Sequence, residues 1–340
     1  MSTRDDILDE VRRYAAAHGP ADLNDDLDDE ILDDEPVTAA AALEPIGEVT
    51  LLNGVVYKPR LLCGIEDLAF MRATRARREH VLFYGPPGTG KTVLAQAPFV
   101  ELATREDATD DTSPWVHQGV ETVVCSATTE EADLIGTFVQ DPISGNHVWN
   151  PGPLHRALIH GIPLYVDEIF LADPRVLSST LYPVMDGRPY LTITANPSLG
   201  PIPIPEGFFV VGSGNPDVPG AVFSEALRDR FDHHIEIGTD WELAAELGVP
   251  AEIITVAKNL DLQRLNQDLS WSPQLRSLLS FRDALGAFGL EFALNNLIAK
   301  TPAEDRHAML KAIESSGYKG NNSGALPLGG RSTKTTGAKR

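Results

Sequence analysis

The sequence predicts an α/β fold in which a parallel sheet is flanked by helices and followed by a small all-helical domain. Short apolar runs rich in β-branched and aromatic residues alternate with helical patterns, and these runs are HVLFYG, ETVVCSA, IPLYVDEI, GFFVVGSGNP and HHIEI. Buried strands of this kind are typical of a parallel sheet covered by helices on both faces. From Thr239 onwards the pattern becomes wholly helical. A chain of 340 residues is long enough for one such α/β domain with a small addition.

Composition divides the chain into four segments. We expect an acidic, largely disordered segment over residues 1–45, an α/β domain over 46–238, a helical lid domain over 239–316 and a disordered basic tail over 317–340. The first segment contains NDDLDDEILDDE, and the tail is rich in Gly, Ser, Thr and basic residues without any acidic one. Charge blocks and low-complexity tails usually stay solvated, so we expect them to keep the chain soluble, with contact to a neighbouring subunit or partner as the alternative.

Charge and cysteine content limit where the protein works. The formal net charge of −21 repels nucleic acid and anionic membranes on average. The sequence has no run of about 18 apolar residues and no basic, apolar leader, so we expect a cytoplasmic protein without membrane insertion. Cys63 and Cys125 lie in apolar stretches, and we expect buried, reduced thiols. No His or Cys cluster has metal-ligand spacing, and Ser213 and Ser224 show no sign of a catalytic triad.

A phosphate-binding loop is the strongest motif. The segment VLFYGPPGTGKT, from Val81 to Thr92, fits GxxxxGK[ST] directly after an apolar strand and before a helical stretch. The glycines allow successive N–H groups to face one anion, and the helix adds its positive N-terminus. We expect Lys91 to reach the β and γ phosphates of ATP or GTP, and the Thr92 hydroxyl to bind Mg²⁺. The predicted nucleotide-binding residues are Gly85, Pro86, Pro87, Gly88, Thr89, Gly90, Lys91 and Thr92. Pro98, two turns into the helix, should kink or shorten it.

A pair of acidic residues follows another predicted strand. The run GIPLYVDEIF ends in Asp167 and Glu168, at the end of the strand where ligands bind in such sheets. Asp167 is the predicted Mg²⁺ ligand, acting through the metal's water shell. Glu168 is the predicted general base, because it lies where it can polarise the attacking water. An isolated Asp-Glu pair would be read as two solvated acids, but the upstream phosphate loop favours hydrolysis.

These motifs resemble those of AAA+ ATPases, and in particular the dynein-related MoxR branch with its NorQ, CbbQ and GvpN types. The segment GSGNP after the fourth strand resembles sensor 1, which implies that Asn215 lies against the γ-phosphate and the attacking water. The segment LLCGIEDLAFM resembles the linker that contacts adenine, although its apolar residues could equally belong to the core. The resemblance covers roughly residues 57–298 and implies ATP as the nucleotide.

Three arginines enter through the same resemblance. The segment FSEALRDRFD resembles the arginine-finger region, so Arg230, with Arg228 as competitor, would reach the nucleotide of the adjacent subunit. The alternative is that these arginines pair on the surface with Asp229 and Asp232. The segment SPQLRSLL resembles the sensor 2 helix and implies a contact from Arg276 to the γ-phosphate, although Gln274 departs from the usual SPR or STR.

Two insertions bear on what the assembly acts on. ADLIGTFVQDPISGNHVWNPGPLHRAL resembles the hairpin within the family's second helix, and GRPYLTITANPSLGPIPIP resembles the hairpin before sensor 1. The resemblance implies a hexamer that remodels or activates a protein, often with a partner carrying a von Willebrand A domain. Neither 134–154 nor 190–206 contains a Lys or Arg to bind a phosphate backbone, so a protein client is favoured. The alternatives are a motor acting on DNA and a slow nucleotide-gated scaffold.

Overall fold

The computed structural model describes residues 43–105, 115–318 and 326. Most of the predicted acidic segment 1–45 and of the predicted basic tail 317–340 lies outside the described residues. Within the described part of the chain, no helix is both long and apolar enough to cross a membrane.

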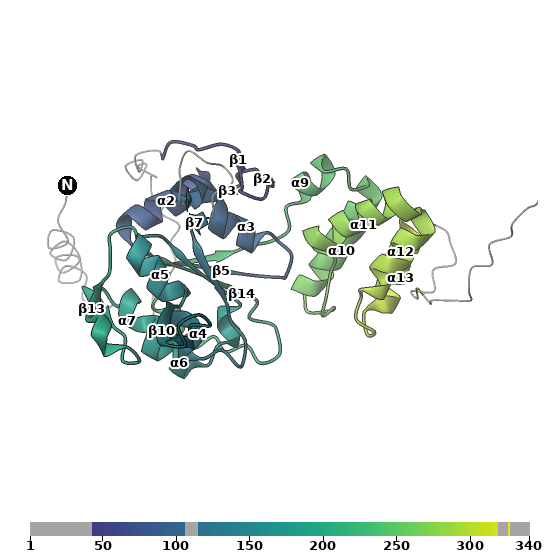
Figure 1. Ribbon diagram of the computed structural model, residues 1–340. Helices are drawn as coiled ribbons and strands as arrows, with labels where there is room; N and C mark the ends of the chain where they lie inside the picture. Colours follow the sequence, from purple (N-terminus) through teal and green to yellow (C-terminus); the bar gives the residue numbers. More distant parts are fainter. Residues whose placement is uncertain (1–42, 106–114, 319–325, 327–340) are drawn as a thin grey trace, which may run out of the picture. The chain divides into compact units, whose positions relative to one another are not determined.

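A five-stranded, all-parallel sheet forms the centre of the α/β region (Figure 1). Its strands, in spatial order, are β15 (His233–Glu236), β5 (Val81–Tyr84), β14 (Val210–Gly214), β11 (Leu164–Asp167) and β8 (Glu121–Val124). The five apolar runs of the sequence therefore form these five strands, and the predicted fold class is confirmed. Because all the strands run the same way, the residues that follow β5, β11 and β14 lie at one edge of the sheet.

Helices cover both faces of the sheet (Figure 1). One face packs against α2 (Asp67–Arg77), α3 (Lys91–Gln96) and the 3₁₀ helix η1 (Ala97–Leu102). The other face packs against α4 (Glu131–Ile135), α5 (Pro153–His160), α6 (Pro174–Thr180) and α7 (Tyr182–Met185). Successive strand residues alternate between the two cores, which is why strands buried on both faces are almost continuously apolar. The α-helix that follows the phosphate loop ends at Gln96, two residues before Pro98, as predicted.

Among the described residues after β15, the regular elements are all helices, and they enclose a hydrophobic core of their own. They are α9 (Trp241–Glu246), α10 (Ala251–Leu265), α11 (Leu275–Phe288), α12 (Leu290–Ala299) and α13 (Arg306–Ser315). The core contains Ile253, Leu278, Phe281 and Ile298, each no more than 1 % exposed.

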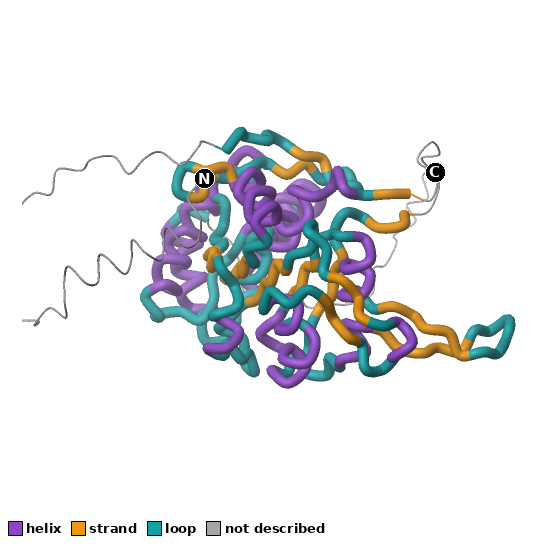
Figure 2. The backbone as a smooth tube through the Cα atoms, turned by 90° about the vertical axis from the view of Figure 1, so that its left-hand side faces the viewer, coloured by secondary structure: helices purple, strands orange, loops and turns teal. Residues whose placement is uncertain are grey.

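Both predicted hairpins are present as antiparallel strand pairs. The first joins β9 (Gly136–Gln140) to β10 (His147–Pro151) between α4 and α5, and it is the strand pair that projects to the right in Figure 2. The second joins β12 (Tyr190–Thr192) to β13 (Pro201–Pro203) ahead of β14, with the 3₁₀ helix η3 (Pro197–Leu199) in its loop.

Short elements complete the α/β region. They are β1 (Val49–Thr50), β2 (Val56–Tyr57), β3 (Leu61–Leu62), β4 (Ile65–Glu66), β6 (Thr104–Arg105), β7 (Trp115–His117), η2 (Ile169–Leu171) and α8 (Glu225–Arg228). The expectation of a buried Cys63 is wrong, because Cys63 and Gly64 form the two-residue turn between β3 and β4 and both have positive φ. The Cys63 thiol is therefore exposed, whereas Cys125 is buried, and both cysteines are free.

Candidate active site

The phosphate loop joins the end of β5 to the first turn of α3. Gly85, Gly88 and Gly90 all have positive φ, at 133°, 83° and 93°. Only glycine takes such conformations without strain, and in loops of this kind they allow successive amides to face one anion. Close approach also requires glycine, since a Cβ on Gly85 would lie 2.6 Å from the carbonyl oxygen of Ile237.

Lys91 is buried at the base of this loop. Its Nζ donates hydrogen bonds to the carbonyl oxygens of Gly85 at 2.8 Å and Pro86 at 2.7 Å. Burial lowers the pKa of Lys91, and the nearby Arg276 lowers it further, whereas the carboxylates of Glu168 and Asp167 act in the opposite direction. The ammonium group therefore lies near Asp167, the last residue of β11, and Glu168, which follows it.

Asp167 is the last residue of β11, and Glu168 follows it in a left-handed conformation with φ of 53°. A non-glycine residue in this region is uncommon and carries backbone strain, which accumulates at functional sites. The amide of Glu168 donates to Asp167 Oδ1 at 3.1 Å. Burial, followed by repulsion from Asp167, raises the pKa of Glu168, while Lys91 lowers it.

Two hydroxyl groups that the sequence did not single out for this site connect its parts. Tyr165 OH lies 3.2 Å from Thr92 Oγ1 and 2.8 Å from Ser213 Oγ, and Ser213 donates to Asp167 Oδ1 at 2.5 Å. Tyr165 and Ser213 are both fully buried. The available signal was a polar residue within an apolar strand, two positions before Asp167 and Asn215, where side chains share a face of the sheet.

Asn215 follows β14 at the same edge of the sheet. Its Oδ1 accepts a hydrogen bond from the amide of Asp217 at 3.1 Å, and the side chain is half-buried. The structure thus places Asn215 directly after the strand that carries Ser213, and its side chain stabilises the following turn. A contact between Asn215 and the γ-phosphate stays a prediction.

The first turn of α11 contacts the phosphate loop. The amide of Arg276 donates to the carbonyl oxygen of Gly88 at 3.2 Å, and a Cβ on Gly88 would lie 2.8 Å from the Cβ of Arg276. Gln274, which departs from the family pattern, is buried and bonds to Thr239 at 2.6 Å, Ser272 at 2.7 Å and Asp261 at 3.0 Å. This network fixes the start of α11 to the segment that enters the helical region.

Arg230 and Arg228 have their partners away from the phosphate loop. Arg230 Nε lies 3.0 Å from Asp186 Oδ1, its Nη1 donates to the carbonyl oxygen of Ala226, and its guanidinium lies 3.9 Å from the ring centre of Tyr182. The guanidinium of Arg228 lies over the ring of Phe223 at 4.2 Å. The expected alternative, pairing with Asp229 and Asp232, is wrong in its partners, because Asp186 takes Arg230 and Asp232 accepts from the amide of His80.

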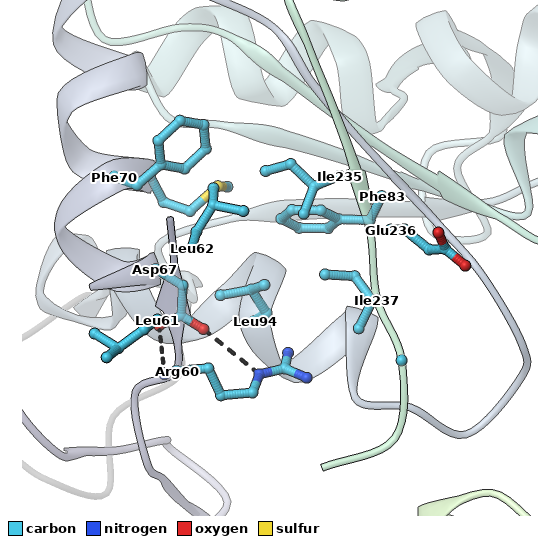
Figure 3. Close-up of a pocket in the computed structure, with 12 residues that line it drawn as sticks. Arg60, Leu61, Leu62, Asp67, Phe70, Phe83, Leu94, Ile235, Glu236 and Ile237 are labelled. Atoms are coloured by element: carbon cyan, nitrogen blue, oxygen red, sulfur yellow. Dashed lines mark hydrogen bonds and ion pairs between the residues drawn. The ribbon is translucent and has the colours of Figure 1, made fainter. Parts of the chain in front are cut away.

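A pocket beside the phosphate loop is suited to an aromatic base (Figure 3). Its apolar walls come from β3, α2, β5, α3 and the end of β15, namely Leu61, Leu62, Phe70, Met71, Phe83, Leu94, Ile235 and Ile237. Arg60 and Asp67 lie at its edge, and Arg60 Nη2 is buried without a hydrogen-bond partner among the described residues. An aromatic ring with acceptor nitrogens would both fill the apolar space and satisfy this donor.

The donor set fits a magnesium ion held jointly with phosphate. The described residues contain no group of three or more His, Cys, Asp or Glu side chains that could hold a metal alone. Thr92 and Asp167 offer a hydroxyl and a carboxylate, and Mg²⁺ favours such oxygen ligands with the remainder supplied by water and phosphate. The residues present therefore fit a metal that arrives with a nucleotide.

Comparison with known proteins agrees with this geometry. Residues 80–231 match the family described as AAA domain (dynein-related subfamily). The chain is 28% identical over 182 residues to a Holliday junction branch migration complex subunit RuvB of Aliarcobacter butzleri (strain RM4018), covering 52% of this chain and 43% of that protein. It is 33% identical over 166 residues to RuvB 1 of Synechococcus sp. (strain JA-3-3Ab), covering 47% and 35%.

Among solved structures, NtrX from Brucella abortus in complex with ADP is 20% identical with a TM-score of 0.38, covering 76% of this chain and 62% of that one. The matches span less than half the length of the two RuvB relatives. The family match takes in the phosphate loop, the Asp167–Glu168 pair, Asn215 and Arg230. Residues 80–231 are therefore similar to an AAA domain of the dynein-related subfamily.

Proposed function

We propose that this chain is an ATP-hydrolysing, Mg²⁺-dependent ATPase of the MoxR type that assembles into a ring, most simply a hexamer, and remodels or activates a protein client. The observation that carries the proposal is the meeting of Lys91, Thr92, Asp167 and Glu168 at one edge of the sheet, with Thr92 and Asp167 joined through buried hydroxyls. A partner with a von Willebrand A domain is part of the proposal on the MoxR resemblance alone.

The residues at the sheet edge divide into those that bind the nucleotide and those that act on the attacking water. Lys91 and the loop amides bind the β and γ phosphates, and Thr92 and Asp167 hold Mg²⁺, which when bound neutralises phosphate charge. Glu168 accepts the proton of the attacking water, Asn215 positions that water, and Arg276 contacts the γ-phosphate. The base occupies the apolar pocket beside Arg60.

Arg230 completes the site of a neighbouring subunit, with Arg228 as the second candidate. Its contacts with Asp186 and Tyr182 are made within one chain and leave the side chain 26% exposed. An ion pair at a partly exposed surface contributes about 0–1 kcal/mol, so a phosphate charge on an adjacent subunit can compete for the guanidinium.

A protein client is favoured by the surface of the β9–β10 hairpin. Phe138, Val139 and Val148 are each at least 40% exposed, and Ile143 at the tip is 95% exposed. Exposed apolar side chains in a projecting hairpin without Lys or Arg suit a polypeptide better than a phosphate backbone (Figure 2). The proteins named RuvB favour the second candidate, a motor acting on DNA, but the chain matches less than half of each.

The test is ATP hydrolysis measured against protein concentration, with and without single-stranded and double-stranded DNA, alongside mass by light scattering. We expect the rate per subunit to rise as the mass rises and to ignore DNA, with Lys91→Ala as the inactive background. Strong stimulation by DNA would overturn the protein client in favour of the motor. A negligible rate at every mass would favour a slow nucleotide-gated scaffold.

A further inference from the structure

A chain of hydrogen-bonded side chains runs across the sheet from Thr92 to Asp167. Thr92 lies in α3, Tyr165 and Asp167 in β11, and Ser213 in β14, so three separate elements contribute to it. The successive oxygen–oxygen distances are 3.2, 2.8 and 2.5 Å. Thr92 and Asp167 have expected roles at the metal, whereas the hydroxyls of Tyr165 and Ser213 have none.

The donor and acceptor capacities of the four side chains determine which of them donates each hydrogen bond. An ionised Asp167 can only accept, so Ser213 must donate to it, and the single hydrogen of Ser213 is then used. The hydrogen of Tyr165 then goes to Ser213 or to Asp167, with which Tyr165 also interacts, and in either case Tyr165 accepts from Thr92. The Thr92 hydrogen consequently points into the protein, and its oxygen lone pairs remain for the exposed side of the residue.

The same direction fixes Asp167. Its Oδ1 accepts from both Ser213 and the amide of Glu168, and these bonds hold the carboxylate in the orientation in which it would serve a metal. Tyr165 and Ser213 are fully buried, so bulk water does not compete with their hydroxyls for these hydrogen bonds. The hydrogen bonds of Tyr165 and Ser213 therefore hold the side chains of Thr92 and Asp167 in one orientation.

We propose that Tyr165 and Ser213 are positioning residues that set the Thr92 hydroxyl and the Asp167 carboxylate for a divalent metal bound with nucleotide. The inference rests on the proposed function, because it assumes that Thr92 and Asp167 serve the metal. Tyr165 and Ser213 are fully buried and would act only through these two residues.

The experiment measures binding of a fluorescent ADP analogue to the full chain, first in excess EDTA and then across a Mg²⁺ titration. Tyr165→Phe keeps the ring packing in the core and removes one hydroxyl. We expect it to leave the EDTA affinity unchanged and to raise the Mg²⁺ concentration for half-maximal enhancement about 3- to 10-fold, the effect of losing one buried hydrogen bond. Ser213→Ala should act in the same direction.

The double variant and a control separate positioning from loss of structure. Because both hydroxyls act in one chain, Tyr165→Phe with Ser213→Ala should shift the Mg²⁺ midpoint by less than the product of the single shifts. Thr74→Val removes another fully buried hydroxyl, bonded to the carbonyl oxygen of Met71, and should leave the midpoint unchanged.

Three results would overturn the inference: an unchanged Mg²⁺ midpoint in both single variants, equal weakening with and without Mg²⁺, or a shift of the same size in Thr74→Val. If Tyr165→Phe does not fold, Ser213→Ala decides the question. Failure of the wild-type chain to bind the analogue in any condition would instead contradict the proposed function.

Discussion

The two ends of the proposed catalytic machinery differ in where their polar side chains find partners. At the edge of the sheet, Thr92, Tyr165, Ser213 and Asp167 bond to one another. Arg230, by contrast, bonds to Asp186 and the carbonyl oxygen of Ala226, neither of which belongs to the phosphate loop or to the acidic pair.

This difference indicates that the fold of one chain orients the residues at the sheet edge but does not bring the arginine to them. Thr92 and Asp167, the residues proposed to hold the metal, are oriented by contacts within a single chain and would be in place before any ligand binds. The arginine is held at the surface by contacts that a stronger negative charge can replace. Binding should therefore survive in isolated subunits, whereas hydrolysis should require the arginine of a neighbour.

The largest effect is expected at Arg230, where a substitution should affect hydrolysis but not nucleotide binding. Arg230→Ala should lower the hydrolysis rate of the assembled protein by about 10³-fold or more, the usual contribution of an arginine finger. Nucleotide affinity should change little, because the guanidinium serves another subunit's transition state. The measurement is single-turnover hydrolysis at a protein concentration where light scattering shows the assembly.

Arg228→Ala is the matched comparison, because its guanidinium contacts the Phe223 ring from the same segment. We expect an effect below about tenfold, which is 1.4 kcal/mol. A reversed order, with Arg228→Ala the more damaging change, would transfer the finger to Arg228. Full activity in both variants would remove the trans arginine from the mechanism.

The next largest effect tests the other side of the comparison. Glu168→Gln should lower hydrolysis by about 10²- to 10⁴-fold, because an amide cannot accept the proton of the attacking water. ATP should still bind, since Lys91 and the loop amides are unchanged. Rapid-quench hydrolysis and equilibrium binding of the nucleotide measure the two quantities separately.

Asp173→Asn is the control for a carboxylate changed to an amide a few residues away. Asp173 caps α6 and pairs with Arg175 at the surface, and an asparagine can serve as the same cap. This control should hydrolyse ATP at the wild-type rate. Hydrolysis by Glu168→Gln as fast as that of the wild type would contradict the assigned base.

The sequence was sufficient for the parts of the site that are contiguous. The phosphate loop and the Asp167–Glu168 pair each follow an apolar strand, so local pattern alone predicted their location and their common edge of the sheet. Cys63 was misplaced because an apolar stretch does not reveal that two of its residues form a turn.

Contacts between distant segments could not be predicted. Arg230 and Asp186 are 44 positions apart, and nothing in either segment distinguishes Asp186 from the nearer Asp229 and Asp232. Ser213 was considered only as a nucleophile, because its neighbours Tyr165 and Asp167 belong to another strand. Pairing of β11 with β14 brings these residues together, and that pairing is a property of the whole fold.

The smallest expected effect concerns Arg276, which extends the comparison to the helical region. Its Cβ packs against Gly88, and Gln274 anchors the same helical turn to Thr239, so its backbone is fixed by one chain like the residues at the sheet edge. If its guanidinium contacts the γ-phosphate, Arg276→Ala should weaken binding of a non-hydrolysable ATP analogue by about tenfold, at the lower end for a charged hydrogen bond. Binding of ADP should be unchanged.

Arg282→Ala is the control on the same helix, since Arg282 bonds to Asp283 and the carbonyl oxygen of Leu247, and it should alter neither affinity. Equal weakening of both nucleotides by Arg276→Ala would place this side chain on the phosphates that ATP and ADP share, and unchanged binding of both would exclude it from the site.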